Sequence, residues 1–265
     1  MPDAAPQKII IETDPGIDDA MAIHQAFADP RLEVIGLTTI FGNVTATRAT
    51  RNALHLAEMA GHPAAIAGGA PVPLRRAPEP PADFVHGPEG FGSLPAPAPN
   101  RATDPRSAAR YLCESCAATP GEIIIGAVGP LTNLAAALAH DPSIAGHARR
   151  VVVMGGSAAR HGNVTDCAEA KLGERICFMH DPSAILAITD PHLFGFETMP
   201  ISVICDGSEI GRTVTGGEGR RDVSVAMGVD TQAARARFME VVAAADDHAA
   251  ARQRNGNAQD IMTGG

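Results

Sequence analysis

The chain has 265 residues, of which 45% are hydrophobic and 19% charged, so it is long enough to bury a sizeable core. Its formal net charge of −9 argues against nucleic acid as a partner, because phosphate binding needs clustered lysine and arginine side chains. No apolar run approaches the roughly 20 residues that span a bilayer, and five cysteines, an odd number, do not predict a disulfide framework. We expect a soluble cytoplasmic protein without a membrane segment. Its charge is compatible with a small neutral ligand or a metal cation.

Short apolar runs alternate with helical patterns along the first part of the chain. We expect strands at Lys8–Glu12, Leu32–Ile40, Ile123–Ala127 and Val151–Met154, and helices at Asp18–Ala28, Thr47–Ala60 and Leu131–His140. Apolar strands joined by helices predict an α/β fold with a mainly parallel central sheet flanked by helices, a Rossmann-like open sheet. In such folds, ligands bind in the loops that follow the carboxyl ends of the strands.

The pattern changes in the middle and at the end of the chain. Ala70–Pro105 is rich in proline and alanine and shows no helical or strand period, which predicts a long loop that is functional or disordered. Later come β-rich runs at Ile201–Cys205 and Val223–Val229, and an alanine-rich helix at Thr231–Arg252. We expect residues 255–265 to be disordered and the whole chain, 1–265, to form a single domain.

Four acidic residues fall within eight positions of the first strand and the turn after it: Glu12, Asp14, Asp18 and Asp19. Carboxylates at a helix N-terminus can cap free amides, which is worth about 0.5–2 kcal/mol and accounts for Asp18 or Asp19 singly. Capping does not account for four acids packed together, because they would repel one another unless a cation joined them. The spacing therefore favours a hard divalent cation with oxygen ligands over capping alone.

This segment resembles the D-x-D-P-G-x-D-D signature of the inosine-uridine nucleoside hydrolase family. Phosphatases of the haloacid dehalogenase type also place paired aspartates after a first strand, but more segments resemble the hydrolase family, in the same order. They are Thr38–Val44, Val85–Gly87, Val128–Leu134, Val151–Gly156 and Gly162–Thr165. The resemblance covers nearly all of Lys8–Glu169 and implies a nucleoside hydrolase-like domain.

The resemblance implies hydrolysis of the N-glycosidic bond of a ribonucleoside, assisted by Ca²⁺, to ribose and free base. By it, Asp14 would be the general base and His180 would face the departing base. The calcium ligands would be Asp14, Asp19, the Val128 carbonyl and Asp181. The substrate-binding residues would be Asp18, Asn43, His86, Met154, Asn163 and Glu169. We expect a nucleoside as the small-molecule partner, and a homo-oligomer.

The chain departs from the family pattern after Glu169. Ala170 and Lys171 stand where the family has an aromatic residue and an asparagine that holds the sugar, and a helix-rich stretch that should follow is missing between 170 and 179. The motif His180-Asp181-Pro182 then matches either an earlier Asp-Pro of the family, which makes His180 incidental, or its late catalytic motif. Later segments favour the second alignment, because they resemble the end of the family sequence in order: Thr189–Pro191, Ile201–Val203 and Gly211–Thr213.

Two other functions stay open at this point. A shortened homologue would bind calcium or a ribosyl ligand without turnover, which the missing block and Lys171 favour. A metal-dependent phosphohydrolase would use Asp14 as a nucleophile, but it leaves the segments of Asn43, His86 and His180 unexplained. The sequence does not decide between purine and pyrimidine nucleosides, because base-facing contacts of the family come partly from the missing block.

Overall fold

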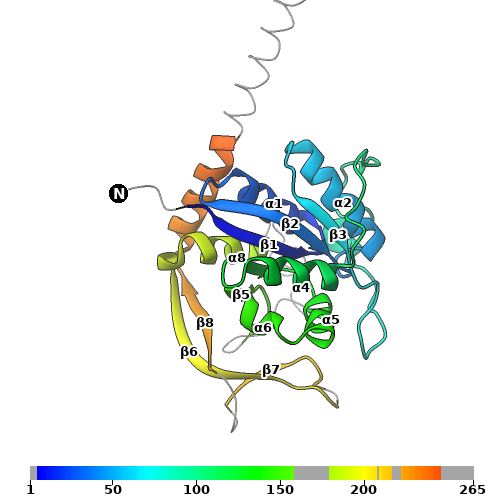
Figure 1. Ribbon diagram of the computed structural model, residues 1–265. Coiled ribbons are helices and arrows are strands. Elements are labelled where there is room, and N and C mark those ends of the chain that lie inside the picture. Colours follow the sequence, from blue (N-terminus) through cyan, green and yellow to red (C-terminus); the bar gives the residue numbers. More distant parts are fainter. Residues whose placement is uncertain (1–4, 158–178, 208, 217–221, 246–265) are drawn as a thin grey trace, which may run out of the picture.

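A five-stranded parallel sheet forms the centre of the computed structural model, which describes residues 5–157, 179–207, 209–216 and 222–245 (Figure 1). The strand order is β3-β2-β1-β4-β5. The strands are β1 (Gln7–Thr13), β2 (Leu32–Thr39), β3 (Ala65–Gly68), β4 (Ile124–Ala127) and β5 (Arg150–Val153). The predicted α/β fold with a mainly parallel sheet is confirmed.

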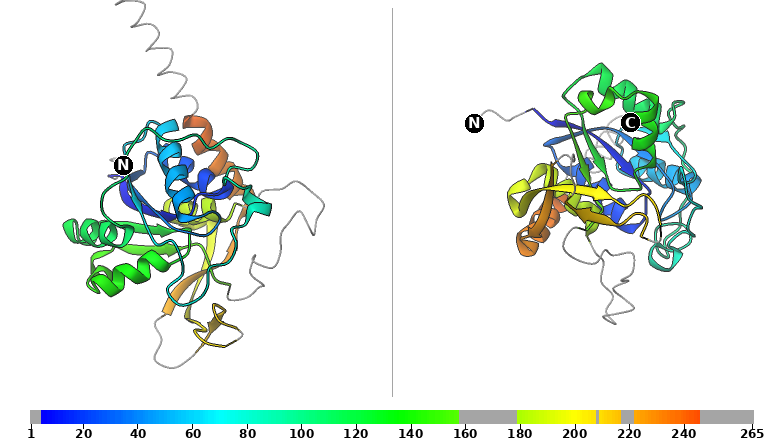
Figure 2. Two further views of the ribbon diagram at one scale, coloured as in Figure 1. Left: turned by 90° about the vertical axis from the view of Figure 1, so that its right-hand side faces the viewer. Right: turned by 90° about the horizontal axis from the view of Figure 1, so that it is seen from below.

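Helices cover both faces of this sheet, as two further views show (Figure 2). On one face lie α1 (Ile17–Ala28), α2 (Ala46–Met59) and α8 (His180–Thr189), and on the other α4 (Ala108–Ala118), α5 (Thr132–His140) and α6 (Ile144–His147). Successive side chains of a strand point to opposite faces. Ile9 and Ile11 of β1 accordingly pack into one apolar core, and Ile10 packs into the other. This is why the strand reads as a continuous apolar run.

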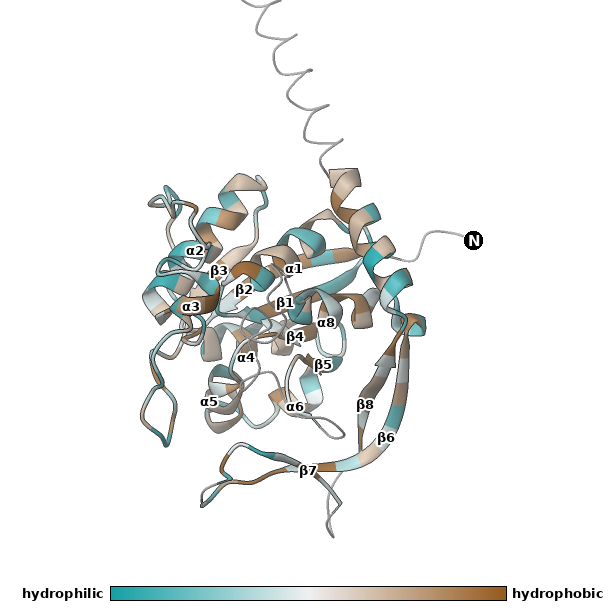
Figure 3. Ribbon diagram, turned by 180° about the vertical axis from the view of Figure 1, so that it is seen from behind, coloured by the Kyte–Doolittle hydropathy of each residue, from teal (hydrophilic) through white to brown (hydrophobic). Residues whose placement is uncertain are grey.

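A second, antiparallel sheet has the order β7-β6-β8. Its strands are β6 (Phe194–Val203), β7 (Thr213–Thr215) and β8 (Asp222–Val229), and β6 follows a 3₁₀ turn at Pro191–Leu193. Most residues of β6 and β8 are exposed, and Figure 3 shows these strands leading away from the helices. A helix over 231–245 then returns to α8, where Phe238 packs against Leu186.

The observed elements differ from the predicted ones in several places. Most strand and helix ends lie one or two residues from the predicted positions, a difference that is common because the last turns and residues of an element fray. The proline-rich segment contains the short helix α3 (Asp83–His86), which at four residues is too short to show a helical period. Strand β6 starts at Phe194 instead of Ile201, because Pro200 interrupts the strand pattern in the sequence. The segments 158–178 and 246–265 lie outside the described residues.

Among the residues that the structure describes, no helix has the length and apolar character needed to cross a membrane.

Candidate functional site

Three carboxylates from segments far apart in the sequence meet at the carboxyl edge of the central sheet. Strand β1 ends at Thr13, and the turn after it leads into α1, whose first turn carries Asp18 and Asp19. Helix α8 carries Asp181 in its own first turn. Oxygen atoms of Asp18, Asp19 and Asp181 all lie within 4.8 Å of one another. We call these three residues the carboxylate cluster.

Asp19 is the best-anchored member of the cluster. Its side chain is fully buried, and its Oδ1 accepts hydrogen bonds from Thr13 Oγ1 at 2.5 Å and from the Asp14 N–H at 3.2 Å. Its Oδ2 accepts from the Gly16 N–H at 3.1 Å and from Asn43 Nδ2 at 2.8 Å. Because Gly16 is the N-cap residue of α1, Asp19 caps the helix and belongs to the cluster at the same time.

Asp14 occupies a space that two glycines leave open. It is 5% exposed, and its Oδ2 accepts a hydrogen bond from the Asn43 N–H at 2.7 Å. A Cβ atom at Gly129 would lie 2.8 Å from Asp14 Oδ1, and one at Gly42 would overlap Oδ2. Burial, followed by repulsion from Asp19, raises the pKa of Asp14 well above its usual range.

Asp18 and Asp181 each present a buried Oδ1 atom that has no hydrogen-bond partner within the described part of the chain. Burial, and then the charge of Asp19, raises the pKa of both carboxyls. A buried acceptor without a donor costs about 1–3 kcal/mol, and a hard divalent cation removes that cost when carboxylate oxygens bind it. The oxygen-only donor set and the two unpartnered atoms therefore fit such a cation.

The clustered carboxylates differ from the metal ligands expected from the sequence. That set contains Asp14, Asp19 and Asp181, with Asp18 on the substrate, whereas the carboxylate cluster contains Asp18 in place of Asp14. Asp14 is joined to the cluster through Asp19, to which its own N–H donates. The fourth expected ligand, Val128, directly follows β4 and is buried, with its N–H bound to the Glu12 carbonyl at 2.8 Å.

Of the other predicted residues that the structure describes, His86 and His180 lie near Asp18. His86 of α3 accepts a hydrogen bond at Nδ1 from the Ile17 N–H at 3.2 Å, and the same nitrogen lies 3.9 Å from Asp18 Oδ1. His180 is near enough for its charge to lower the pKa of Asp18, against the larger effect of burial. Met154 follows β5 and is half-buried. The other two predicted substrate-binding residues, Asn163 and Glu169, lie outside the described residues, as does Lys171.

Glu12 does not join the other acids, contrary to the expectation of four packed carboxylates. Its fully buried side chain accepts hydrogen bonds from Thr38 Oγ1 at 2.6 Å and from Asn133 Nδ2 at 2.7 Å. Burial raises the pKa of Glu12 to about 8, although these two hydrogen bonds oppose the shift. Sequence reasoning assigned no role to Thr38 or Asn133, although both fall within segments that resemble the family.

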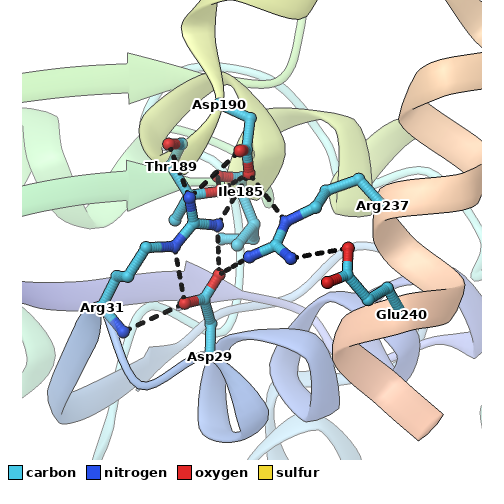
Figure 4. Close-up of polar contacts among 7 residues, drawn as sticks. All are labelled: Asp29, Arg31, Ile185, Thr189, Asp190, Arg237 and Glu240. Atoms are coloured by element: carbon cyan, nitrogen blue, oxygen red, sulfur yellow. Dashed lines mark hydrogen bonds and ion pairs between the residues drawn. The ribbon is translucent and has the colours of Figure 1, made fainter. Parts of the chain in front are cut away.

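A charged cluster, which we call the Arg31 clasp, fixes the far end of α8 (Figure 4). Arg31 Nη2 donates to Asp29 Oδ2 and to Asp190 Oδ2, both at 2.7 Å, and Nη1 donates to the Thr189 carbonyl at 3.2 Å. Arg237 approaches Asp190 to 3.5 Å from the helix over 231–245. Burial raises the pKa of Asp190, but the hydrogen bonds from Arg31 outweigh it and lower that pKa to about 2. The clasp joins the end of α1 to the end of α8.

An open parallel sheet with acidic residues at its carboxyl edge defines an α/β protein with a candidate metal site. The sequence matches the family described as inosine-uridine preferring nucleoside hydrolase over residues 9–173, and the chain belongs to this family. The family resemblance seen in the sequence is thus confirmed.

Individual relatives agree with this membership. The chain is 49% identical over 167 residues to uridine nucleosidase 1 of Arabidopsis thaliana, a match covering 63% of this chain and 50% of that protein. The chain therefore spans about half the length of the curated relatives it matches.

Solved structures match over more of the chain. The plant nucleoside hydrolase PpNRh1 superimposes with a TM-score of 0.84 and 31% identity, covering 89% of this chain and 99% of that one. A purine-preferring ribonucleoside hydrolase from Gardnerella vaginalis gives a TM-score of 0.83 at 25% identity, covering 90% of this chain and 99% of that one. These superpositions extend beyond residues 9–173 and so include segments that follow the break in the sequence pattern.

Proposed function

We propose that this protein hydrolyses the N-glycosidic bond of ribonucleosides to ribose and free base, with Ca²⁺ at the carboxylate cluster. The observation that carries the proposal is the arrival of Asp181, from the late His-Asp-Pro motif, beside Asp18 and Asp19. A chain that kept the family fold but held Asp181 elsewhere would lack one of the three carboxylates of the cation site. Family membership and the named activities of the relatives support the same reaction.

The calcium ligands we propose are Asp19, Asp181 and the Val128 carbonyl. Asp14 and Asp18 would lie between the ion and the sugar, where each can contact either one. When bound, calcium supplies Lewis acidity and a fixed point for the ribose hydroxyls. The unpartnered Oδ1 of Asp18 is available to the ion or to a ribose hydroxyl. Asn43 faces the same space and already donates to Asp19.

Asp14 suits the role of general base. Burial, followed by repulsion from Asp19, raises its pKa, so this carboxyl takes up a proton more readily than an ordinary aspartate does. Its orientation is set by the Asn43 N–H and by the two glycines that make room for it. The surrounding carboxylates also stabilise the positive charge that develops on the sugar in an oxocarbenium-like transition state.

The departing base needs a proton or a hydrogen-bond donor. His180 and His86 lie on the Asp18 side of the cluster, one at the start of α8 and one in α3. We assign proton donation to His180 and contact with the base to His86. Because Ile17 donates to His86 Nδ1, a neutral His86 ring carries its proton on Nε2. We further assign Met154, Asn163 and Glu169 to the ribose.

Base release from inosine and from uridine, measured with and without a calcium chelator, tests this function. We expect release that chelation abolishes and added calcium restores. Asp14→Asn should lower kcat by about 10²–10⁴-fold, the usual contribution of a general base, with an unchanged circular dichroism spectrum. Asp141→Asn, an identical change at the C-cap of α5, should leave kcat unchanged. A phosphate ester as the preferred substrate would overturn the proposal.

A second candidate is a homologue that binds calcium or a ribosyl ligand without turnover. The observation that favours it is that the chain spans about half the length of its curated relatives. Thermal stabilisation by calcium with no base released from any nucleoside would establish this candidate and exclude hydrolysis.

We also propose the cytoplasmic location and the homo-oligomer that are expected from the sequence. Light scattering of the purified protein measures its oligomeric state.

A further inference from the structure

We propose that Asn133 and Glu12 are positioning residues that hold the loop between β4 and α5, and with it the Val128 carbonyl, at the calcium site. This inference rests on the proposed function, because it concerns the geometry of the calcium ligands. Neither residue is a ligand itself. Both are buried, and the side chain of Asn133 donates a hydrogen bond to that of Glu12.

Glu12 holds the start of this loop through its main chain. Its carbonyl oxygen accepts hydrogen bonds from the Val128 N–H at 2.8 Å and from the Gly129 N–H at 3.1 Å. The Gly129 N–H and the Val128 carbonyl belong to one planar trans peptide, in which the two groups point in opposite directions. Fixing this N–H on Glu12 therefore directs the Val128 carbonyl away from β1.

Asn133 holds the end of the same loop, in the first turn of α5. Its Nδ2 donates to Glu12 Oε1 at 2.7 Å and to the Thr39 carbonyl at 3.0 Å, while its Oδ1 accepts from the Ala70 N–H at 2.8 Å. Asn133 is 2% exposed, and all these partners lie at the carboxyl ends of β1, β2 and β3. A buried polar network with every member satisfied is rigid, because each group that moves loses a partner.

The loop also shapes the space around Asp14. Gly129 lies so close that a Cβ there would come within 2.8 Å of Asp14 Oδ1 and 3.0 Å of the Ile40 side chain. A displacement of this loop by about a few tenths of an ångström thus shifts the positions of the Val128 carbonyl and of the Asp14 carboxylate together. Glu12 and Asn133 control that displacement from both ends of the loop.

A pair of exchanged side chains separates this role from a general contribution to folding. Asn133→Asp keeps an acceptor for the Ala70 N–H but removes the amide that donates to Glu12 Oε1 and to the Thr39 carbonyl. Glu12→Gln alone can turn its amide to keep accepting from Asn133. In the Glu12→Gln/Asn133→Asp double variant the amide turns the other way, so that Gln donates to Asp. The double variant therefore restores the contact between positions 12 and 133 with donor and acceptor exchanged, but not the hydrogen bond to the Thr39 carbonyl.

The measurement is calcium affinity by titration calorimetry on the full chain, with melting temperatures in chelator recorded beside it. We expect Asn133→Asp to raise the Kd for calcium about tenfold or more, Glu12→Gln to stay within about threefold, and the double variant to recover part of the loss, because its hydrogen bond to the Thr39 carbonyl stays broken. A merely structural role would lower the melting temperature and leave the Kd unchanged. An unchanged Kd in Asn133→Asp, or no recovery in the double variant, overturns this inference alone.

Two milder variants keep the test decisive if Asn133→Asp does not fold. Thr38→Val removes the hydroxyl that holds Glu12 Oε2, and Thr38→Ser retains it. We expect Thr38→Val to weaken calcium binding about threefold to tenfold and Thr38→Ser to stay within about twofold. Equal affinities for these two variants would count against the inference. A wild-type protein that binds no calcium would overturn the proposed function and this inference with it.

Discussion

The buried Glu12 makes the stability of the metal-free protein depend on pH. Burial raises its pKa from 4.5 to about 8 in the folded protein. Because the folded-state pKa lies above the unfolded value, the stability that the neutral carboxyl contributes is fully present below pH 4.5. It is lost as the pH rises through the interval up to about 8. The unfolded chain ionises in this interval, whereas the folded chain keeps its proton.

The size of the effect follows from proton linkage. One proton bound by the folded state alone changes the free energy of unfolding by about 1.4 kcal/mol per pH unit. With the two pKa values of Glu12, the loss between pH 5 and pH 7.5 comes to about 3 kcal/mol. Glu12→Gln cannot ionise, so the variant should lack this part of the pH dependence. Its absolute stability at any one pH is not the test.

Urea unfolding in chelator at several pH values between 5 and 7.5 measures the difference. The nearby aspartates with raised pKa also make the folded protein less stable as the pH rises. Their contribution is the same in the wild type and in Glu12→Gln, so it cancels in the comparison. Glu33→Gln, the same change at an exposed position of the neighbouring strand, should follow the wild type. Parallel curves for the wild type and Glu12→Gln would refute the reasoning that burial keeps this carboxyl neutral.

Three further predictions concern the cation and the framework of the site. Calcium at about a hundred times its Kd should raise the free energy of unfolding by about 2.7 kcal/mol. Asp19→Asn should remove most of that gain, which differential scanning fluorimetry with calcium and with chelator measures as a smaller shift of the melting temperature. Gly42→Ala should cut base release about a hundredfold with its circular dichroism spectrum intact, because the added methyl group overlaps Asp14 Oδ2; wild-type activity would contradict it. Arg31→Met should lower the free energy of unfolding by about 1–3 kcal/mol in urea titrations, a value discounted because Arg31 is 38% exposed. Arg110→Met, which breaks an exposed pair, should stay within about 0.5 kcal/mol of the wild type.

The central sheet was predictable because its strands are covered on both faces. Ile9, Ile10 and Ile11 are all fully buried, so the strand appears in the sequence as an uninterrupted apolar run. The position of the site followed from the same topology, since parallel strands bring their carboxyl ends to one edge. Strand β3 and helix α3, with four residues each, are too short to leave a periodic signal.

The site was less predictable than the fold because it depends on where each acidic side chain points, which the order of the acidic residues in the sequence does not determine. Glu12 and Asp14 are two positions apart, yet Glu12 is bound by Thr38 and Asn133, whereas Asp14 contacts the residues around the cluster. The Arg31 clasp leaves no local pattern either, because Asp190 lies 159 positions further along the chain. Only the packed structure brings such partners together.

The Arg31 clasp and the carboxylate cluster are two ends of one arrangement. Asp29 is the C-cap of α1 and Asp190 is the C-cap of α8, so Arg31 bridges the ends of two helices that run side by side in the same direction. At about 1.5 Å per residue, Asp19 lies about 15 Å before the clasp on α1 and Asp181 about 14 Å before it on α8. With the C-termini tied together, these nearly equal lengths bring both carboxylates to the same level. The chain can therefore complete its acidic site even though the segment before α8 is short, because the register of α8 is set from its far end.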